Sequence, residues 1–334
     1  VKTLRPDLAK EKSYVGRFLD EARIAIQLTH QNIAQTFDAG CHEGVYFLAM
    51  EHVEGVTLRQ LMKLAHDSVP TPVALMILAE ALDALDAAHR HKHPLTREAL
   101  GVVHRDVSPQ NVMLSYDGEV KVIDFGLAAS KLKVEETESN VVLGKIAYMS
   151  PEQATGNVVD GRTDQYAAAV ILYELLAGER FYGKRSNRDI WLVAGDPPTP
   201  AKWFGLDPPV RHILERALAK NRDDRFATCA EFATALRAYL HERFPAADRT
   251  MLRTFVTETS NDERAKAEQS LVNVAPALLS QSPLTITSVT ALDAAKNNIV
   301  EAEVRRRLNA RALYVALALL LTAAFAIVVP LLLK

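Results

Sequence analysis

The stretch His104-Arg105-Asp106-Val107-Ser108-Pro109-Gln110-Asn111, followed shortly by Asp124-Phe125-Gly126, decides the fold of this chain. Two short β-prone runs lie between these motifs, residues 112–115 and 119–123. The dipeptide Asp117-Gly118 separates the runs, and Asp-Gly is a strong signal for a tight hairpin turn. The sequence therefore predicts a β-hairpin with one polar motif directly before its first strand and the other directly after its second strand.

Asp106, Asn111 and Asp124 are the chemically interesting members of the two motifs. A loop that enters one strand and a loop that leaves its partner emerge at the same end of a hairpin, so we expect these three side chains to share a small volume. Two carboxylates and an amide oxygen suit Mg²⁺, which prefers a few protein oxygens and several phosphate or water oxygens. One carboxylate can instead accept a hydroxyl proton. Asp-Phe-Gly alone is weak evidence, but both motifs at this spacing are highly specific.

The two motifs resemble those of eukaryotic-like protein kinases, and the resemblance extends over residues 1 to about 240. It implies an α+β, bilobal fold with a small β-rich N-lobe, incomplete here, and a larger helical C-lobe. It also implies Mg²⁺ and ATP as cofactors. Asp106 would orient and deprotonate a substrate hydroxyl, while Asn111 and Asp124 would hold Mg²⁺ against the phosphates.

The same resemblance assigns residues around the nucleotide. Lys2 would grip the α- and β-phosphates and pair with Glu21, although the two residues also fit a simple exposed ion pair. Apolar Met50 and Met113 fit an ordinary core as well as an adenine pocket. The implied nucleotide-binding set is Lys2, Glu21, Met50, Glu51, Val53 and Met113.

Further residues of the resemblance are regulatory or structural. Glu152 of Ser150-Pro151-Glu152 would pair with Arg225, and Asp164 would be a buried acid of the central helix, or alternatively a helix cap. Arg105 suggests activation by a phosphate on the loop 127–143. The candidate phosphate acceptors are Thr137 and Ser139, although an unmodified flexible loop remains an alternative.

Ser108 and Lys145 depart from the family pattern, which has a Lys and a Thr at these two places. We hypothesise that the groups have traded positions, so that Lys145 supplies positive charge to the transferred phosphoryl group and Ser108 supplies the hydroxyl. The alternative is that Lys145 is a solvated loop lysine. Residues 107–111 and 144–153 otherwise resemble membrane-anchored bacterial serine/threonine kinases.

The sequence begins at Val1, on the strand that carries Lys2. The family's Gly-rich loop precedes this strand, so we expect an incomplete record, an exposed sheet edge and an open nucleotide site. Two rival functions are weighed. One is a truncated or pseudokinase-like scaffold without efficient phosphotransfer. The other is a small-molecule phosphotransferase of the aminoglycoside-kinase type, which generally lacks the segment containing Ser150-Pro151-Glu152.

The composition of the chain excludes several classes of protein. The chain has 334 residues, 49% hydrophobic and 24% charged, with a net charge of −2. It is not disordered throughout, its two cysteines cannot build a disulfide framework, and it lacks a basic footprint for nucleic acid. Periodicity predicts a strand over 45–50 and helices over 14–29, 72–89, 164–177, 209–219 and 227–239.

Residues 312–333 carry no charge and are rich in Leu, Ala and Val. As a helix they would extend about 33 Å, enough to cross a bilayer. Arginines precede this stretch, which predicts that the region before it faces the cytoplasm. Together with the resemblance, this implies a single-pass protein of the bacterial inner membrane whose cytoplasmic kinase domain phosphorylates Ser/Thr of proteins, itself included. The expected layout is a partial N-lobe (1–51), C-lobe (52–245), helical extension (246–271), juxtamembrane linker (272–311) and transmembrane helix (312–333).

Overall fold

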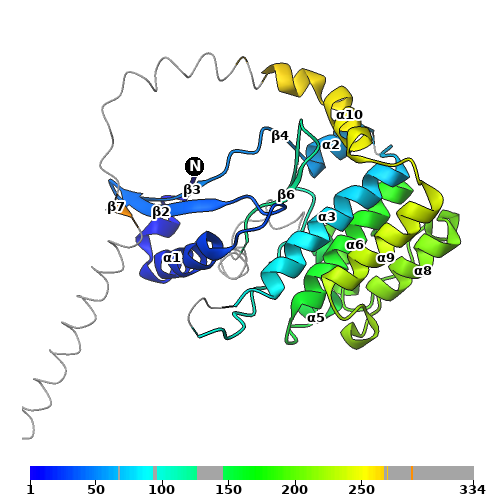
Figure 1. The fold of residues 1–334 in the computed structure, drawn as a ribbon. Coiled ribbons are helices and arrows are strands. Elements are labelled where there is room, and N and C mark those ends of the chain that lie inside the picture. Colours follow the sequence, from blue (N-terminus) through cyan, green and yellow to red (C-terminus); the bar gives the residue numbers. More distant parts are fainter. Residues whose placement is uncertain (67, 93–95, 126–145, 267–268, 270–286, 289–334) are drawn as a thin grey trace, which may run out of the picture.

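A computed structural model describes residues 1–66, 68–92, 96–125, 146–266, 269 and 287–288 of the chain. Its β-rich lobe and its helical lobe lie side by side (Figure 1). The N-terminal residues lie in the β-rich lobe.

The small lobe is an antiparallel sheet with one helix against it. The strands are β1 (Lys2–Thr3), β2 (Thr36–His42), β3 (Val45–Met50) and β7 (Thr287–Ser288), in the order β1-β3-β2-β7. The 3₁₀ turn η1 (Leu8–Lys10) leads into α1 (Lys12–Gln27), which packs on the sheet. Helix and sheet share a small apolar core of Phe18, Leu19, Ala22, Ala39 and Leu48.

β7 comes from the region expected to be a linker. Its two residues pair with Gly40 and Cys41 of β2, far away in sequence. β7 therefore lies at one edge of the sheet and β1 at the other. Periodicity did not predict this strand.

The predicted hairpin supplies two strands of a second sheet, with strand order β4-β5-β6. Its strands are β4 (Gly55–Thr57), β5 (Val112–Ser115) and β6 (Val120–Val122), and Val112 faces Val122. Gly55 is required where β4 meets β5, because a Cβ there would lie 1.9 Å from the carbonyl oxygen of Leu114.

Buried helices form the large lobe. α3 (Thr71–His89) and α6 (Gly161–Ala177) pack together and bury almost their entire lengths, with α9 (Cys229–Arg243) beside them. The side chain of Asp160 caps α6, and Gly178, with φ of 61°, ends it. The other elements are α2 (Leu58–Leu64), η3 (Ile146–Tyr148), α5 (Pro151–Ala154), α7 (Asn187–Val193), η4 (Trp203–Gly205), α8 (Pro208–Ala217) and η5 (Arg222–Asp224).

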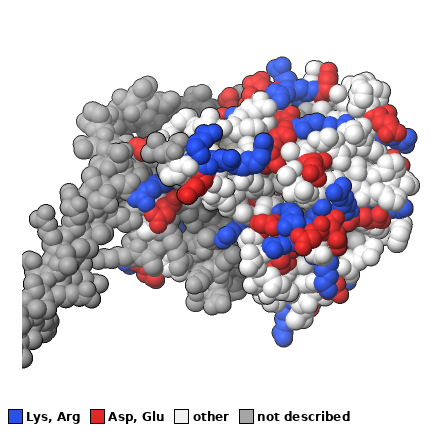
Figure 2. Space-filling model, turned by 60° about the horizontal axis from the view of Figure 1, so that its bottom comes forward, with Lys and Arg blue, Asp and Glu red and all other residues white. Residues whose placement is uncertain are grey.

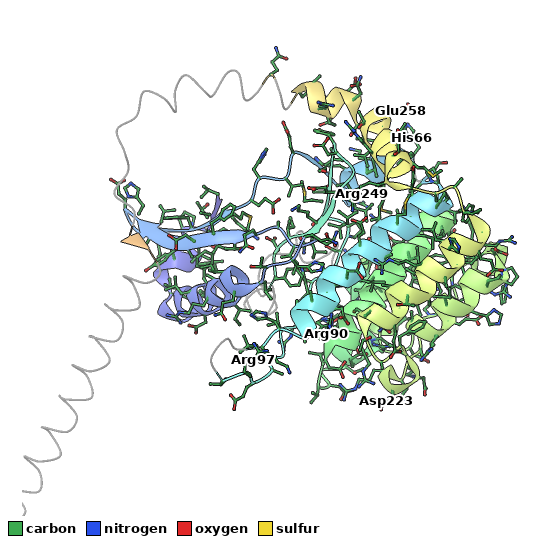
Figure 3. The ribbon with its side chains drawn as sticks, in the orientation of Figure 1. His66, Arg90, Arg97, Asp223, Arg249 and Glu258 are labelled. Carbon is green, nitrogen blue, oxygen red and sulfur yellow. The ribbon has the colours of Figure 1, made fainter. Side chains whose placement is uncertain are left out.

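Helix α10 (Arg249–Thr259) lies within the expected helical extension. It buries Leu252 and Val256 and contacts α2, α3 and β5. Figure 3 shows Arg249 and Glu258 of α10 near His66, just after α2. The hydroxyl of Thr257 donates to the carbonyl of Tyr116 (3.3 Å), so α10 touches the turn of the hairpin.

Within the described ranges, no helix is both long and apolar enough to cross a membrane. The predicted span 312–333 and most of the predicted linker lie outside these ranges, so the membrane helix stays a prediction.

Candidate active site

One buried carboxylate, that of Asp164 in α6, holds the loop of residues 104–111, which the resemblance makes the candidate catalytic loop. It accepts hydrogen bonds from the backbone N–H groups of His104 (2.8 Å) and Arg105 (2.7 Å). The imidazole Nε2 of His89, at the end of α3, lies 2.7 Å from the same carboxylate. Arg105 has φ of 62°, an unusual conformation for a residue other than glycine. Asp164 is therefore an anchor for the loop and not a helix cap, a position that Asp160 fills.

The packing of His89 depends on Gly161 at the start of α6. A Cβ on Gly161 would lie 2.5 Å from Nδ1 of the His89 ring. We predict that Gly161→Ala displaces the ring and lowers the free energy of unfolding by about 1–3 kcal/mol, measured by urea denaturation. Gly16→Ala in α1 is the matched control, because its Cβ would meet nothing within 4 Å, and it should be neutral or slightly stabilising. Equal effects of the two changes would contradict the prediction.

His104 has a structural environment. Its Nδ1 accepts from the N–H of Asp106 (3.3 Å), so its Nε2 carries the proton and donates to the carbonyl of Ile123 (2.9 Å). The ring also packs edge-on against Phe125 at 4.7 Å between centroids. The Nε2 hydrogen bond and the Phe125 contact thus connect the two polar motifs, while the Nδ1 hydrogen bond lies within the first motif.

Asp106 and Asn111 lie in direct contact. The Nδ2 of Asn111 donates to the carbonyl of Asp106 (2.7 Å) and to its Oδ2 (3.1 Å). The N–H of Ile123 donates to the carbonyl of Asn111 (3.0 Å), which places Asp124 one residue beyond this pairing. The hairpin therefore brings the ends of both motifs together as expected.

Asp124 forms an ion pair with Lys2, whose Nζ lies 2.6 Å from Oδ2 of Asp124. The carboxylate is 13% exposed and the lysine 34% exposed. Asp124 has φ of 67°, a second left-handed residue at this site. The side chain of Glu21 is outside what the structure describes, so its pairing with Lys2 stays a prediction.

The donor set fits a hard cation. Across the described residues, no three His, Cys, Asp or Glu side chains gather as a metal cluster. Two carboxylates and one amide instead lie at one hairpin end, where Asn111 contacts Asp106 and Asp124 contacts Lys2. Such a sparse oxygen set is what Mg²⁺ accepts when phosphate and water complete its shell.

The segment after β3 connects the two lobes. Glu51 is engaged in structure: its Oε1 pairs with Lys121 (2.7 Å), and its Oε2 accepts from the N–H of Gln35 (3.0 Å). The backbone of Val53 makes no hydrogen bond with other described residues. Met50 ends β3, and Met113 lies on β5, both partly buried.

Ser108 is 3% exposed, and its hydroxyl has no hydrogen-bond partner among the described residues. Lys145, Thr137 and Ser139 fall in 126–145, outside the described part of the chain. The exchange of roles between Ser108 and Lys145, and the loop phosphate facing Arg105, stay predictions.

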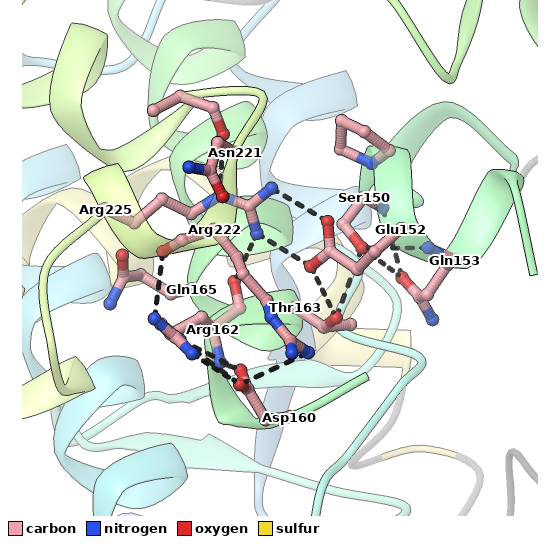
Figure 4. Close-up of polar contacts among 12 residues, drawn as sticks. Ser150, Glu152, Gln153, Asp160, Arg162, Thr163, Gln165, Asn221, Arg222 and Arg225 are labelled. Carbon is pink, nitrogen blue, oxygen red and sulfur yellow. Dashed lines mark hydrogen bonds and ion pairs between the residues drawn. The ribbon is translucent and has the colours of Figure 1, made fainter. Parts of the chain in front are cut away.

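Glu152 and Arg225 form a buried bidentate ion pair (Figure 4). Both Oε atoms of Glu152 lie 2.8 Å from guanidinium nitrogens of Arg225, whose side chain is fully buried. The hydroxyl of Thr163 donates to Glu152 as well (2.8 Å). Burial raises the pKa of Glu152, but the hydrogen bonds and charge of Arg225 outweigh it and hold this pKa below its ordinary value.

Two contacts near the site were not predicted from sequence. One is His89 on Asp164. The other is at Glu174. The hydroxyl of Tyr148 donates to Oε2 of Glu174 (2.8 Å), and the N–H of Phe181 donates to Oε1 of the same residue (3.1 Å). Burial raises the pKa of Glu174. A histidine at a helix end or a glutamate in an apolar helix was the only sequence signal for these contacts.

The comparisons with known proteins agree with this geometry. Residues 1–236 match the protein kinase domain family, and the chain belongs to that family. It is 37% identical over 273 residues to the tyrosine-protein kinase MasK of Myxococcus xanthus, covering 79% of this chain and 42% of that protein. It is 37% identical over 245 residues to the serine/threonine-protein kinase PknB of Mycolicibacterium smegmatis, covering 71% and 38%.

A crystal structure of the Mycobacterium tuberculosis PknI kinase domain is also similar, with a TM-score of 0.53 and 30% identity. The match covers 71% of this chain and 84% of that one. The chain spans about two fifths of the length of the curated relatives. The expected bilobal kinase fold, with its β-rich and helical lobes, is thus confirmed.

Proposed function

We propose that this chain is a protein serine/threonine kinase that transfers the γ-phosphoryl group of ATP to Ser or Thr hydroxyls of proteins, itself included. The observation that carries the proposal is the convergence of Asp106, Asn111, Asp124 and Lys2 on one end of the β5–β6 hairpin.

Asp106 is the proton acceptor in this proposal. Its carboxylate is positioned through the amide of Asn111 and through a loop that Asp164 anchors. A base held at a fixed position can accept the proton of a substrate hydroxyl as the oxygen attacks phosphorus. Lys2, beside Asp124, carries positive charge to where the nucleotide phosphates would lie.

The residues fit ATP and Mg²⁺. The backbone N–H and carbonyl of Val53 can pair with an adenine edge, with Met50 and Met113 nearby as apolar contacts. Asn111 and Asp124 would hold Mg²⁺, which when bound neutralises phosphate charge. The chain's own residues then orient the acceptor and remove its proton.

The hydroxyl specificity is part of the proposal, because relatives named serine/threonine kinases and one named a tyrosine kinase are similarly close to this chain. The test is incubation of the full chain with γ-labelled ATP and a protein substrate, with and without Mg²⁺, followed by mass spectrometry. We expect Mg²⁺-dependent phosphate on Ser and Thr. Phosphate only on Tyr would overturn the specificity, and nucleotide binding without transfer would favour the scaffold function.

We also infer attachment to a bacterial inner membrane through residues 312–333, with the kinase domain in the cytoplasm. The support is the uncharged stretch and the arginines that precede it, at positions 305, 306, 307 and 311. The full chain should sediment with membranes and resist salt extraction, whereas a chain that ends at residue 311 should not. Equal behaviour of both chains would reject the anchor.

A further inference from the structure

The carboxylate of Glu174, in the helical lobe near the catalytic loop, is closed to a substrate. Glu174 is 3% exposed, and both of its oxygens accept protein hydrogen bonds, from Tyr148 and Phe181. Tyr148 lies in the same segment of the chain as Gln153. The side-chain amide of Gln153 donates to the carbonyl of Arg105 (3.1 Å). A basic side chain of a substrate would find no available carboxylate here.

Arginines lie around this closed pair. The N–H of Arg59 donates to the carbonyl of Pro109 in the catalytic loop (2.8 Å), which places the start of α2 beside this loop. Arg180 immediately precedes Phe181, whose N–H donates to Glu174 (3.1 Å). The charges of Arg59 and Arg180 both lower the pKa values of Tyr148 and Glu174, against the larger upward effect of burial. Neither forms an ion pair with any described residue.

The segment that follows α6 and includes the first turn of α7 extends this positive charge. Lys184, Arg185 and Arg188 are exposed, as is Arg180, and none of them pairs with a carboxylate of the described residues. The acids of this segment are engaged: Glu179 accepts from Tyr173 and from the N–H of Lys202, and Asp189 bonds to Ser186. On the face that Figure 2 shows, basic and acidic side chains are interleaved.

We propose that Arg59, Arg180, Lys184, Arg185 and Arg188, here called the basic cluster, bind acidic side chains that flank the acceptor hydroxyl of a protein substrate. This inference rests on the proposed kinase function and adds a substrate class to it. The chain contains such a sequence itself: Thr137 and Ser139 are neighbours of Glu135, Glu136 and Glu138. A second copy of this chain is thus one substrate of the expected chemistry.

The expected effect is moderate, because the contacts are exposed and screened by salt. Single exposed ion pairs contribute little, so two or three acting together should change affinity by about tenfold at low salt. Most of this preference should vanish at high salt, where charges farther apart than a few ångströms are screened.

The experiment compares two fluorescent peptides that bind to the full chain without ATP. One has the sequence of residues 133–141, and the other carries Gln in place of its three glutamates. The Kd should be about tenfold lower for the acidic peptide, and the ratio should fall to about twofold in the double variant Arg59→Gln/Arg180→Gln. The kcat/KM ratio of the two peptides should change in parallel.

Arg253→Gln is the matched control. Arg253 is 62% exposed on α10, 3.7 Å from the exposed Asp117 and at the opposite end of the hairpin. This variant should keep the full preference, and thermal melts should show that all variants fold. Equal Kd values for the two peptides, or a preference that survives the double variant, would overturn the proposal. Because binding is measured without phosphoryl transfer, this result is separate from a failure of the kinase function.

Discussion

Replacing Asp106 by Asn should reduce kcat/KM for phosphoryl transfer by about a thousandfold, because it removes the only proposed proton acceptor. The substitution keeps an oxygen that can accept from Nδ2 of Asn111, as the carboxylate does now at 3.1 Å. Folding and ATP affinity should therefore change little. The measurement is the initial rate of labelled phosphate transfer, beside a thermal melt and a nucleotide titration.

Asp117→Asn provides the matched control for this prediction. Asp117 is 84% exposed in the turn of the same hairpin, so the change removes an equal charge far from the catalytic end. Activity of this control should remain at the wild-type level. If Asp106→Asn retained more than a tenth of the wild-type rate, Asp106 would not be the proton acceptor.

Removing one partner of the Glu152–Arg225 pair should cost about 3–5 kcal/mol of unfolding free energy, because it leaves a buried charge without compensation. Glu152→Ala would strand the fully buried guanidinium of Arg225. The double variant Glu152→Met/Arg225→Met should lose much less than the sum of the single changes, since it removes both charges together. Urea denaturation measures each value, and additive losses would contradict the coupling.

The same pair makes stability sensitive to acid. The pKa of Glu152 lies below its ordinary value of 4.5 in the folded protein. Its contribution is therefore fully present above pH 4.5 and is lost as the pH falls through the lowered folded pKa. Wild-type stability should decline more steeply in this range than that of the double methionine variant. Parallel declines would show that other groups cause the acid sensitivity.

Much of the fold near the site was predictable from local sequence. The strands expected at 112–115 and 45–50 match β5 and β3, and the helix expected at 72–89 differs from α3 by one residue. Strong turn chemistry and long apolar periodicity act within a few neighbouring residues, so they can be read from one sequence. β2 and α2 were given no bounds from the sequence, because β2 mixes small and polar residues that blur its alternation and α2 has only seven residues.

The candidate site likewise contains residues whose positions local sequence predicts and residues whose contacts it does not predict. Asp106, Asn111 and Asp124 share a hairpin end because β-strand topology dictates it. From the sequence, Asp164 could be a buried acid of the central helix or a helix cap, and its hydrogen bonds to the catalytic loop depend on how α6 packs against that loop. No local pattern signals His89, since its contact spans 75 residues of sequence.

The anchoring of the catalytic loop by Asp164 has a consequence for how the protein acquires activity during synthesis. Residues 104–106 leave the ribosome well before Asp164, and Arg225, which secures Glu152, comes later still. Because the left-handed backbone at Arg105 depends on that distant carboxylate, a nascent chain cannot hold the loop in its working shape. The proposed phosphoryl transfer should therefore require that the central helices have first been translated and packed.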